Sequence, residues 1–321
     1  MKGIHHIIVQ NNVVRYEFDI RRNITIIRGD SATGKTQLVS MLESFQQNGI
    51  SSGIEVRCDT EINVIYSNNW KSEIARLKGC IFFIEEGQAF VASDEFADMV
   101  KNSDGYFVII TRQNLDNLPY STGEIYGIRS AGKYKGMKQT YNEFYRLYGD
   151  IASLTDEIKN IYTEDSNAGY DFFAKTCAQD IRCKSAGGKS NIPRLLKDHS
   201  EDPVLVIADG AAFGPQMESV MRLIENGQKV LLYLPESFEW LLLSSNILND
   251  RDVNEILRHP HDYIDSESFF SWERFFTNLL IEKTNGSFLA YNKSKLNEAY
   301  IQPKIKERIL SCLPDIIRKL F

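Results

Sequence analysis

The chain has 321 residues, a formal net charge of −6 and a composition that is 43% hydrophobic and 25% charged. This composition excludes a disordered, collagenous or disulfide-rich chain, and the acidic balance argues against a general nucleic-acid coat while allowing a local basic groove. At roughly 150 residues per domain, the length indicates two domains.

Cysteine usage and hydropathy indicate the compartment. The five cysteines include no CxxC pair, which favours ordinary reduced thiols in the cytoplasm. The first residues lack the apolar core of a signal peptide, and no apolar run reaches membrane-spanning length. We therefore expect a soluble cytoplasmic protein without a membrane partner.

Strand patterns dominate the first part of the chain. Apolar runs predict strands over 4–10, 13–20, 24–27, 62–66, 80–84, 106–110 and 125–128. A glycine-rich turn follows the third run, and a helix is predicted after it over 37–46. Residues 131–155 are polar, basic and punctuated by glycine, so we interpret them as the connection between two domains. Their lysines, Lys133, Lys135 and Lys138, fit either a solvated linker or contact with a nucleic-acid backbone.

A second strand and helix series follows, and then a helical region. Strands are predicted over 160–163, 181–184, 203–208 and 229–234, and helices over 168–179, 190–197 and 216–226. Such alternation predicts a parallel sheet covered on both faces. The fold class is therefore α/β, with a first α/β domain over 1–130, the connection over 131–155, a second α/β domain over 156–240 and a helical region over 241–321.

The glycine-rich turn, GDSATGKT at 29–36, matches the phosphate-binding pattern GxxxxGK[ST] between a strand and a helix. Its members are Gly29, Asp30, Ser31, Ala32, Thr33, Gly34, Lys35 and Thr36. Glycines let backbone N–H groups face phosphate oxygens, and the N-terminus of the following helix adds its dipole. Lys35 is predicted to reach the β- and γ-phosphates and Thr36 to ligate Mg²⁺. We expect ATP with Mg²⁺, although the motif does not distinguish ATP from GTP.

Two carboxylates follow the apolar strand predicted at 80–84. An acidic residue at the end of such a strand holds Mg²⁺ in nucleotide-binding P-loop proteins, and we assign this role to Glu85. Glu86 is predicted to polarise the attacking water and, with Lys35, to be catalytic. The alternative is a solvated acidic turn. Thr111 and Arg112, after the strand predicted at 106–110, are candidate sensors of the γ-phosphate.

Residues 4–45 resemble the start of ABC-type and RecF-like ATPases, in which a short antiparallel hairpin precedes the phosphate-loop strand. The chain departs from that family in two ways. It has no LSGGQ-like signature, and the interval between the phosphate loop and Glu85 is too short for a full helical insertion. The resemblance therefore implies a reduced P-loop ATPase and leaves the head-to-tail ATPase dimer in doubt.

Residues 156–240 resemble a Toprim domain, the metal-dependent fold of topoisomerases, primases and overcoming-lysogenisation-defect nucleases. Glu164 matches the acid after the first strand, and Asp209 matches the first member of the DxD pair. Ala211 stands where the second aspartate is expected, and Asp165 or Glu236 are candidate replacements. The resemblance implies that Glu164 and Asp209 hold Mg²⁺ for phosphodiester chemistry. The alternative is a plain α/β domain whose acids cap helices.

A second glycine turn lies in this region, at 185–190. It is too short for another phosphate loop. We interpret it as a turn that lets Lys189 approach a nucleic-acid phosphate or simply opens a helix.

The whole chain resembles a compact overcoming-lysogenisation-defect protein. That resemblance implies an ATPase whose nucleotide state controls a nucleic-acid-processing domain, as in mobile elements and anti-phage defence. One rival is a nucleotide-dependent regulatory protein with a catalytically dead second domain, which Ala211 favours. Another is a small-molecule or RNA kinase, which the Toprim-like half argues against. Nucleotide is the expected ligand; nucleic acid and a second copy of the chain are candidate partners.

The sequence His259-Pro260-His261-Asp262 combines metal-binding residue types. No further cysteine or histidine pair lies nearby in the sequence, and the proline predicts a loop. We therefore interpret it as a surface loop rather than a Zn²⁺ site.

Overall fold

The computed structural model describes residues 1–29, 34–131, 139–149, 158–199 and 202–321. The chain is an α/β protein that divides into two compact units. Unit 1 contains residues 1–149 and 259–271, and unit 2 contains residues 150–258 and 272–321. No helix in the described part of the chain has both the length and the apolarity needed to cross a bilayer.

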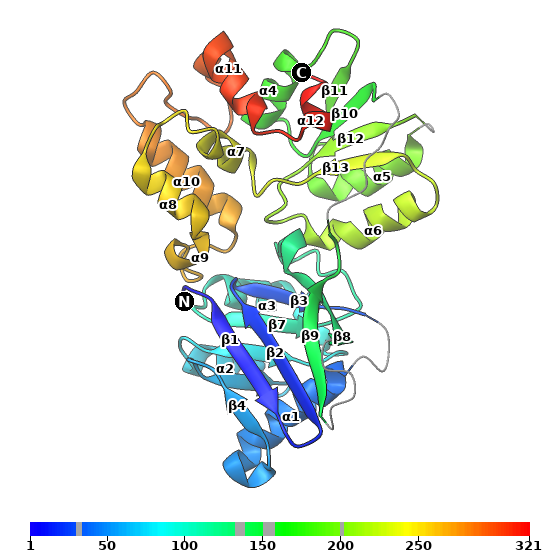
Figure 1. Cartoon of the computed structure of the whole chain (residues 1–321), viewed down its shortest axis with the longest axis vertical. Helices are drawn as coiled ribbons and strands as arrows, with labels where there is room; N and C mark the ends of the chain where they lie inside the picture. Colours follow the sequence, from blue (N-terminus) through cyan, green and yellow to red (C-terminus); the bar gives the residue numbers. More distant parts are fainter. Residues whose placement is uncertain (30–33, 132–138, 150–157, 200–201) are drawn as a thin grey trace. The chain divides into compact units, whose positions relative to one another are not determined.

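Unit 1 is built on a mixed sheet, which has nine strands within the described residues (Figure 1). The strands are β1 (His5–Gln10), β2 (Val14–Ile20), β3 (Ile24–Ile27), β4 (Glu55–Arg57), β5 (Ile62–Ile65), β6 (Ile81–Ile84), β7 (Tyr106–Ile110), β8 (Ile125–Ser130) and β9 (Thr140–Arg146). Their order across the sheet is β4-β1-β2-β9-β8-β3-β7-β6-β5. Strands β8, β3, β7, β6 and β5 form a parallel block, whereas β1 pairs antiparallel with β2 and β4.

Burial of apolar strands and one long helix forms the core of unit 1. Every residue of β3, β6 and β7 is buried, as expected for parallel strands covered on both faces. Helix α1 (Lys35–Asn48) places Leu38 and Leu42 in the same apolar cluster as Phe83 and Val108. Each such side chain contributes about 1.5–3 kcal/mol when fully buried, so packing on the sheet stabilises α1 more than intrinsic helix propensity does.

The remaining helical elements of unit 1 are short. They are η1 (Gly49–Ser52), α2 (Trp70–Arg76), η2 (Ala89–Ala92), α3 (Asp94–Lys101), η3 (Thr122–Glu124) and α9 (Pro260–Tyr263). The predicted strands at 24–27 and 106–110 are confirmed at the same bounds, and the other predicted strands of this part are present with ends shifted by one or two residues.

Two parts of unit 1 differ from the sequence-based division of the chain. Residues 131–155, predicted as a connection, include β9, which pairs with β2 and β8. The sequence does not predict this strand, because its residues are mostly polar and partly exposed and form no continuous apolar run. The segment 259–271, predicted as part of one helical region over 241–321, belongs to unit 1. Lys133, Lys135 and Lys138 lie outside the described residues.

Unit 2 contains a parallel sheet, four-stranded within the described residues, as the strand and helix alternation predicted. Its strands are β10 (Asn160–Thr163), β11 (Arg182–Ser185), β12 (Val204–Ile207) and β13 (Val230–Tyr233), in the order β11-β10-β12-β13. Every pairing is parallel.

Helices make up most of the rest of unit 2. They are α4 (Ala168–Thr176), η5 (Lys189–Asn191), α5 (Ile192–Asp198), α6 (Gly214–Glu225), α7 (Phe238–Ser244), α8 (Arg251–Arg258), α10 (Trp272–Thr284), η6 (Glu298–Ile301), α11 (Pro303–Ser311) and α12 (Asp315–Arg318). The predicted helical character after Phe238 is therefore confirmed. Helix α7 packs against α10 and α11, so the region after the sheet contributes directly to the core of this unit.

Candidate functional sites

The three predicted functional segments of unit 1 meet at one edge of its sheet. Strand β7 lies between β3 and β6 and pairs in parallel with both. The carboxyl ends of parallel neighbours emerge at the same edge, where α/β proteins place their ligands. The predicted phosphate loop after β3, the two carboxylates after β6 and the polar pair after β7 are therefore neighbours.

The described ends of the phosphate loop have the backbone conformation that glycine favours. Gly29 and Gly34 have φ of +128° and +91°. A Cβ atom on Gly34 would lie 2.7 Å from the Tyr16 hydroxyl, which itself donates a 2.9 Å hydrogen bond to the Gly34 carbonyl. Lys35 is buried as the first residue of α1, and its Nζ donates to the Gly29 carbonyl at 2.8 Å. Residues Asp30, Ser31, Ala32 and Thr33 lie outside the described residues.

The loop after β6 is held by a hydrogen bond to the loop after β5. Gln88 Oε1 accepts from the backbone N–H and the hydroxyl of Ser67, at 3.0 and 2.7 Å. Glu86, in this loop, forms an ion pair of 2.7 Å with Arg112 Nε. The predicted catalytic carboxylate and a predicted sensor are thus in direct contact, although both are well exposed to solvent, which limits the strength of the pair.

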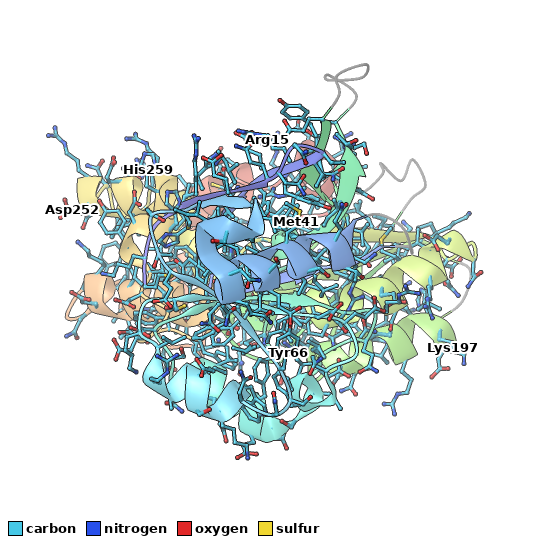
Figure 2. The ribbon with its side chains drawn as sticks, turned by 90° about the horizontal axis from the view of Figure 1, so that it is seen from below. Arg15, Met41, Tyr66, Lys197, Asp252 and His259 are labelled. Carbon is cyan, nitrogen blue, oxygen red and sulfur yellow. The ribbon has the colours of Figure 1, made fainter. Side chains whose placement is uncertain are left out.

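Tyr66 (labelled in Figure 2) follows β5 beside Glu85, the predicted Mg²⁺ residue. Its hydroxyl oxygen is buried. Burial, followed by a hydrogen bond with Glu43 and then by the charges of Glu43 and Glu85, raises the pKa of Tyr66. Tyr66 therefore stays protonated at neutral pH. An aromatic residue at a strand end carries no motif, so sequence reasoning missed it.

Arg28 connects the phosphate-loop strand to the loop after β7. It is buried immediately before Gly29, and its Nη2 donates to the Gln113 carbonyl at 2.9 Å, to Asn114 Oδ1 at 2.8 Å and to the Tyr120 hydroxyl at 3.1 Å. Hydrogen bonds from a buried guanidinium are directional and strong. Arg28 thereby fixes the loop that begins with the candidate sensors. The sequence signal that could have identified Arg28 is its charge directly after an apolar strand.

The two predicted acids of unit 2 are adjacent in the structure. Strands β10 and β12 are parallel neighbours, and the acids follow their carboxyl ends. The Asp209 backbone N–H donates to Glu164 Oε2 at 2.9 Å, and Asp209 Oδ1 accepts from the Phe238 backbone N–H at 3.2 Å. Both acids line one cavity. The structure therefore brings together Glu164 and Asp209 from segments that are far apart in the sequence.

Residues from the helical part of unit 2 complete this cavity. Glu239, Tyr291 and Lys293 line it together with the two acids. The Tyr291 hydroxyl donates to Glu239 Oε1 at 2.8 Å, and Lys293 forms an ion pair with Glu273. Sequence reasoning missed all of these residues, because they lie on separate elements that only tertiary packing brings to the sheet edge.

The proposed replacements for the missing carboxylate have other positions. Asp165 lines the cavity, but its oxygens accept from the backbone N–H and the side-chain amide of Asn167 at 3.2 and 2.6 Å. Among the described residues that line the cavity, Glu239 is present and Glu236 is not. Ala211 itself is buried. Glu239 is therefore a further carboxylate of this cavity, besides Asp165.

The second glycine turn supports the same sheet edge. Gly187 and Gly188 have φ of +69° and +127°, and η5 begins at the following residue, as predicted for a turn that opens a helix. Lys189 Nζ donates to the Ala212 carbonyl at 2.6 Å. Its charge also opposes the increase in the pKa of Glu164. Lys189 is thus bonded to the loop after β12 rather than extended into solvent.

Burial changes the protonation of the paired acids. It raises the pKa of Glu164 to about 7, against the hydrogen bond from Asp209 and the charge of Lys189. Burial, followed by the charges of Glu273 and Glu164, raises the pKa of Asp209 well above its ordinary value. Burial alone would lower the pKa of Lys293, but the carboxylates of Glu273 and Glu239 outweigh it and keep this lysine charged. A cation is therefore favoured where these acids meet.

No family model matches this sequence, and a search of the curated proteins finds no match. The functional argument therefore depends on the geometry of the two sheet edges.

The increased pKa of Glu164 predicts a pH dependence of stability. Between pH 4.5, the ordinary pKa, and about 7, the folded protein holds a proton that the unfolded chain has released. The contribution of Glu164 to the free energy of unfolding should therefore fall as the pH rises through this window and level off above it. Glu164→Gln removes the titrating group, so its stability should fall less, as measured by urea unfolding at successive pH values.

Asp180→Asn provides the matched control. Asp180 is an exposed acid of the same unit whose pKa is lowered by its hydrogen bond with Lys159, so it is ionised throughout the window. Its variant should retain the full pH dependence. Parallel curves for the wild type and Glu164→Gln would show that the Glu164 pKa is not raised.

Proposed function

We propose that unit 1 is a P-loop nucleotide-binding domain that binds ATP with Mg²⁺ and hydrolyses it. The observation that most directly supports this is the parallel arrangement of β3, β7 and β6, which aligns the ends that precede Lys35, Glu85 and Arg112. A strand, a glycine turn and a helix with an N-terminal lysine form a site for polyphosphate. The adjacent strand ends supply the acidic and cationic groups that phosphoryl transfer needs.

Each residue of this edge has a distinct role in the proposal. Lys35 neutralises the β- and γ-phosphates, and the Thr36 hydroxyl and Glu85 hold Mg²⁺. Glu86 orients and polarises the attacking water. Arg112, which contacts Glu86 directly, has the charge and position to exchange that carboxylate for a γ-phosphate oxygen. Mg²⁺, when bound with the nucleotide, supplies charge that neutralises the phosphates.

We further propose that unit 2 is a Toprim-like domain under the control of nucleotide state. The contact between Glu164 and Asp209 at parallel strand ends supports this. Carboxylate oxygens are ligands that Mg²⁺ and Mn²⁺ prefer, so these two acids would hold such an ion, with water in the remaining positions. The ion would supply Lewis-acid chemistry for a phosphodiester, with nucleic acid as the substrate class. A role in mobile elements or anti-phage defence follows only from the family resemblance.

The second candidate is a nucleotide-dependent regulatory protein with an inactive unit 2. The buried Ala211 favours it, because no carboxylate occupies the second position of the acidic pair. The ion pair of Lys293 with Glu273 also favours the regulatory candidate. The Lys293 ammonium already balances part of the negative charge of the cavity, which a metal ion would otherwise balance.

Lys35→Ala tests nucleotide binding. The substitution removes the ammonium group that donates to the Gly29 carbonyl and that, in the proposal, neutralises the phosphates. The affinity for ATP should therefore fall at least tenfold, which corresponds to about 1.4 kcal/mol of binding free energy. Isothermal titration with Mg²⁺-ATP provides the measurement. Lys71→Ala is the control, because Lys71 is an exposed lysine of unit 1 paired with Glu95. Equal affinities of Lys35→Ala and the wild type would remove the basis of the proposal for unit 1.

Glu86→Gln separates binding from chemistry. The amide keeps the size of the side chain but lacks the basic oxygen, so ATP should still bind while the hydrolysis rate falls about 10²–10⁴-fold. Single-turnover hydrolysis and nucleotide titration measure the two effects. Glu73→Gln, which breaks another ion pair of unit 1, with Arg76, should leave both unchanged. Hydrolysis that survives Glu86→Gln would move the water-orienting role to another residue.

The carboxylate site of unit 2 is tested by metal-dependent melting. In a Lys35→Ala background, which suppresses nucleotide-linked metal, Mn²⁺ should raise the melting temperature, because it binds the folded state only. Glu164→Ala or Asp209→Asn should abolish the shift, and Asp180→Asn should preserve it. With Ala211 in place of a carboxylate, we expect little or no nuclease activity in isolation.

Cleavage of DNA or RNA separates the two candidates for unit 2. Metal-dependent cleavage that Asp209→Asn removes would support the Toprim-like enzyme. Metal binding without cleavage would support the inactive regulatory domain. A melting temperature that does not respond to Mn²⁺ or to either acid would contradict the metal site and leave the acids with a structural role.

A further inference from the structure

The segment that follows α8 in the sequence belongs to unit 1 and is attached to it by hydrogen bonds. The His261 carbonyl accepts from the Gly3 backbone N–H at 2.8 Å. Farther along, the Ser266 hydroxyl donates to the Asp104 carbonyl at 2.8 Å. The side chain of Ile264 is buried. The turn at 259–264 therefore has a defined position in unit 1, independent of the two sites proposed above.

Backbone hydrogen bonds close this turn. Pro260 is the first residue of the short helix α9, and the Asp262 N–H donates to the His259 carbonyl at 3.0 Å. The Ile264 N–H donates to the Pro260 carbonyl at 2.9 Å. The segment is thus an ordered helical turn rather than the open loop that the proline indicated. This turn places a ring nitrogen of His259, a ring nitrogen of His261 and an Asp262 carboxylate oxygen within 4.8 Å of one another.

We propose that His259, His261 and Asp262 bind a divalent transition-metal ion such as Zn²⁺, Co²⁺ or Ni²⁺. Two imidazole nitrogens and one carboxylate oxygen are a donor set that these ions accept, with the remaining positions taken by water. Ligand atoms at bond lengths of about 2.0–2.2 Å around a tetrahedral ion lie about 3.3–3.5 Å apart. His259 (labelled in Figure 2) and Asp262 are exposed, and a bound ion would draw the three ligand atoms to this separation through changes of side-chain rotamer.

The charges around the turn set the affinity. Burial lowers the pKa of His261, and the neighbouring His259 and Arg21 act in the same direction against the carboxylate of Asp262. A metal ion binds the neutral form of an imidazole ring. The positive charge of Arg21 also opposes a bound cation, so we expect weaker binding than at a closed structural site with four protein ligands.

Another group of unit 1 provides a natural comparison. His6 lies 2.7 Å from an Asp19 oxygen and 3.3 Å from a Glu17 oxygen, at an exposed position. It offers one imidazole, and its carboxylate neighbours, chiefly through the hydrogen bond with Asp19, raise its pKa and favour the protonated ring. Proton binding competes with metal binding, so His6 should not hold a transition metal at neutral pH. The pair of imidazoles distinguishes the turn at 259–262.

Cobalt titration of the full chain without nucleotide tests the proposal. All proteins carry Glu164→Gln, so that the carboxylate site of unit 2 contributes less to Co²⁺ binding. The chain with this substitution alone is the parent. We expect one Co²⁺ per chain, detected by its visible absorption and displaced by Zn²⁺. His259→Gln and Asp262→Asn alter exposed residues and should retain the metal-free melting temperature. Each should weaken Co²⁺ binding at least tenfold, whereas His6→Gln should bind as the parent does.

Two results would overturn the proposal. One is Co²⁺ affinity in His259→Gln and Asp262→Asn that equals the parent affinity. The other is the absence of stoichiometric Co²⁺ binding to the parent itself. Because the experiment uses no nucleotide and no nucleic acid, its outcome is independent of ATP hydrolysis and of nuclease activity.

Discussion

Parallel pairing of β3, β7 and β6 is the constraint on which the candidate site of unit 1 depends. These strands are buried along their whole length, and apart from Thr25 and Tyr106 their side chains are apolar. Their functional residues are therefore confined to the positions just beyond each carboxyl end. Since the pairing is parallel, all these positions lie on one edge. Lys35, Glu85 and Arg112 become neighbours for this reason and not through their spacing in the sequence.

The same constraint operates in unit 2 with a different electrostatic result. Its acids follow β10 and β12, and residues from the helical part of the unit line the same cavity and leave both acids half-buried. Burial raises the pKa of Glu164 and Asp209, so the uncharged forms are favoured unless a cation is present. Lys293 supplies one positive charge from within the protein. Under the two functions proposed for unit 2, an internal ammonium would favour the regulatory domain and a bound metal ion the catalytic one.

Hydrogen bonds outside the predicted sites fix the positions of the loops at both sheet edges. In unit 1, Arg28 holds the loop after β7 and Gln88 holds the loop after β6. In unit 2, Lys189 holds the loop after β12. These residues do not belong to any motif, yet groups that act on phosphate need positions fixed to a fraction of an ångström. The arrangement of such contacts explains why a short motif is a starting point for a site and not the site itself.

The sequence alone predicted most of the strands and the helix after the glycine turn, because apolar periodicity is a local property. The phosphate chemistry predicted at 29–36 depends on the local pattern GxxxxGK[ST] in the same way. It also identified Glu164 and Asp209 through their places after apolar runs. Only the tertiary structure decided that Glu239 and Lys293 join those acids, that β9 enters the first sheet, and that 259–271 packs with unit 1. Each of these depends on contacts between segments far apart in the chain, for which local pattern carries no signal.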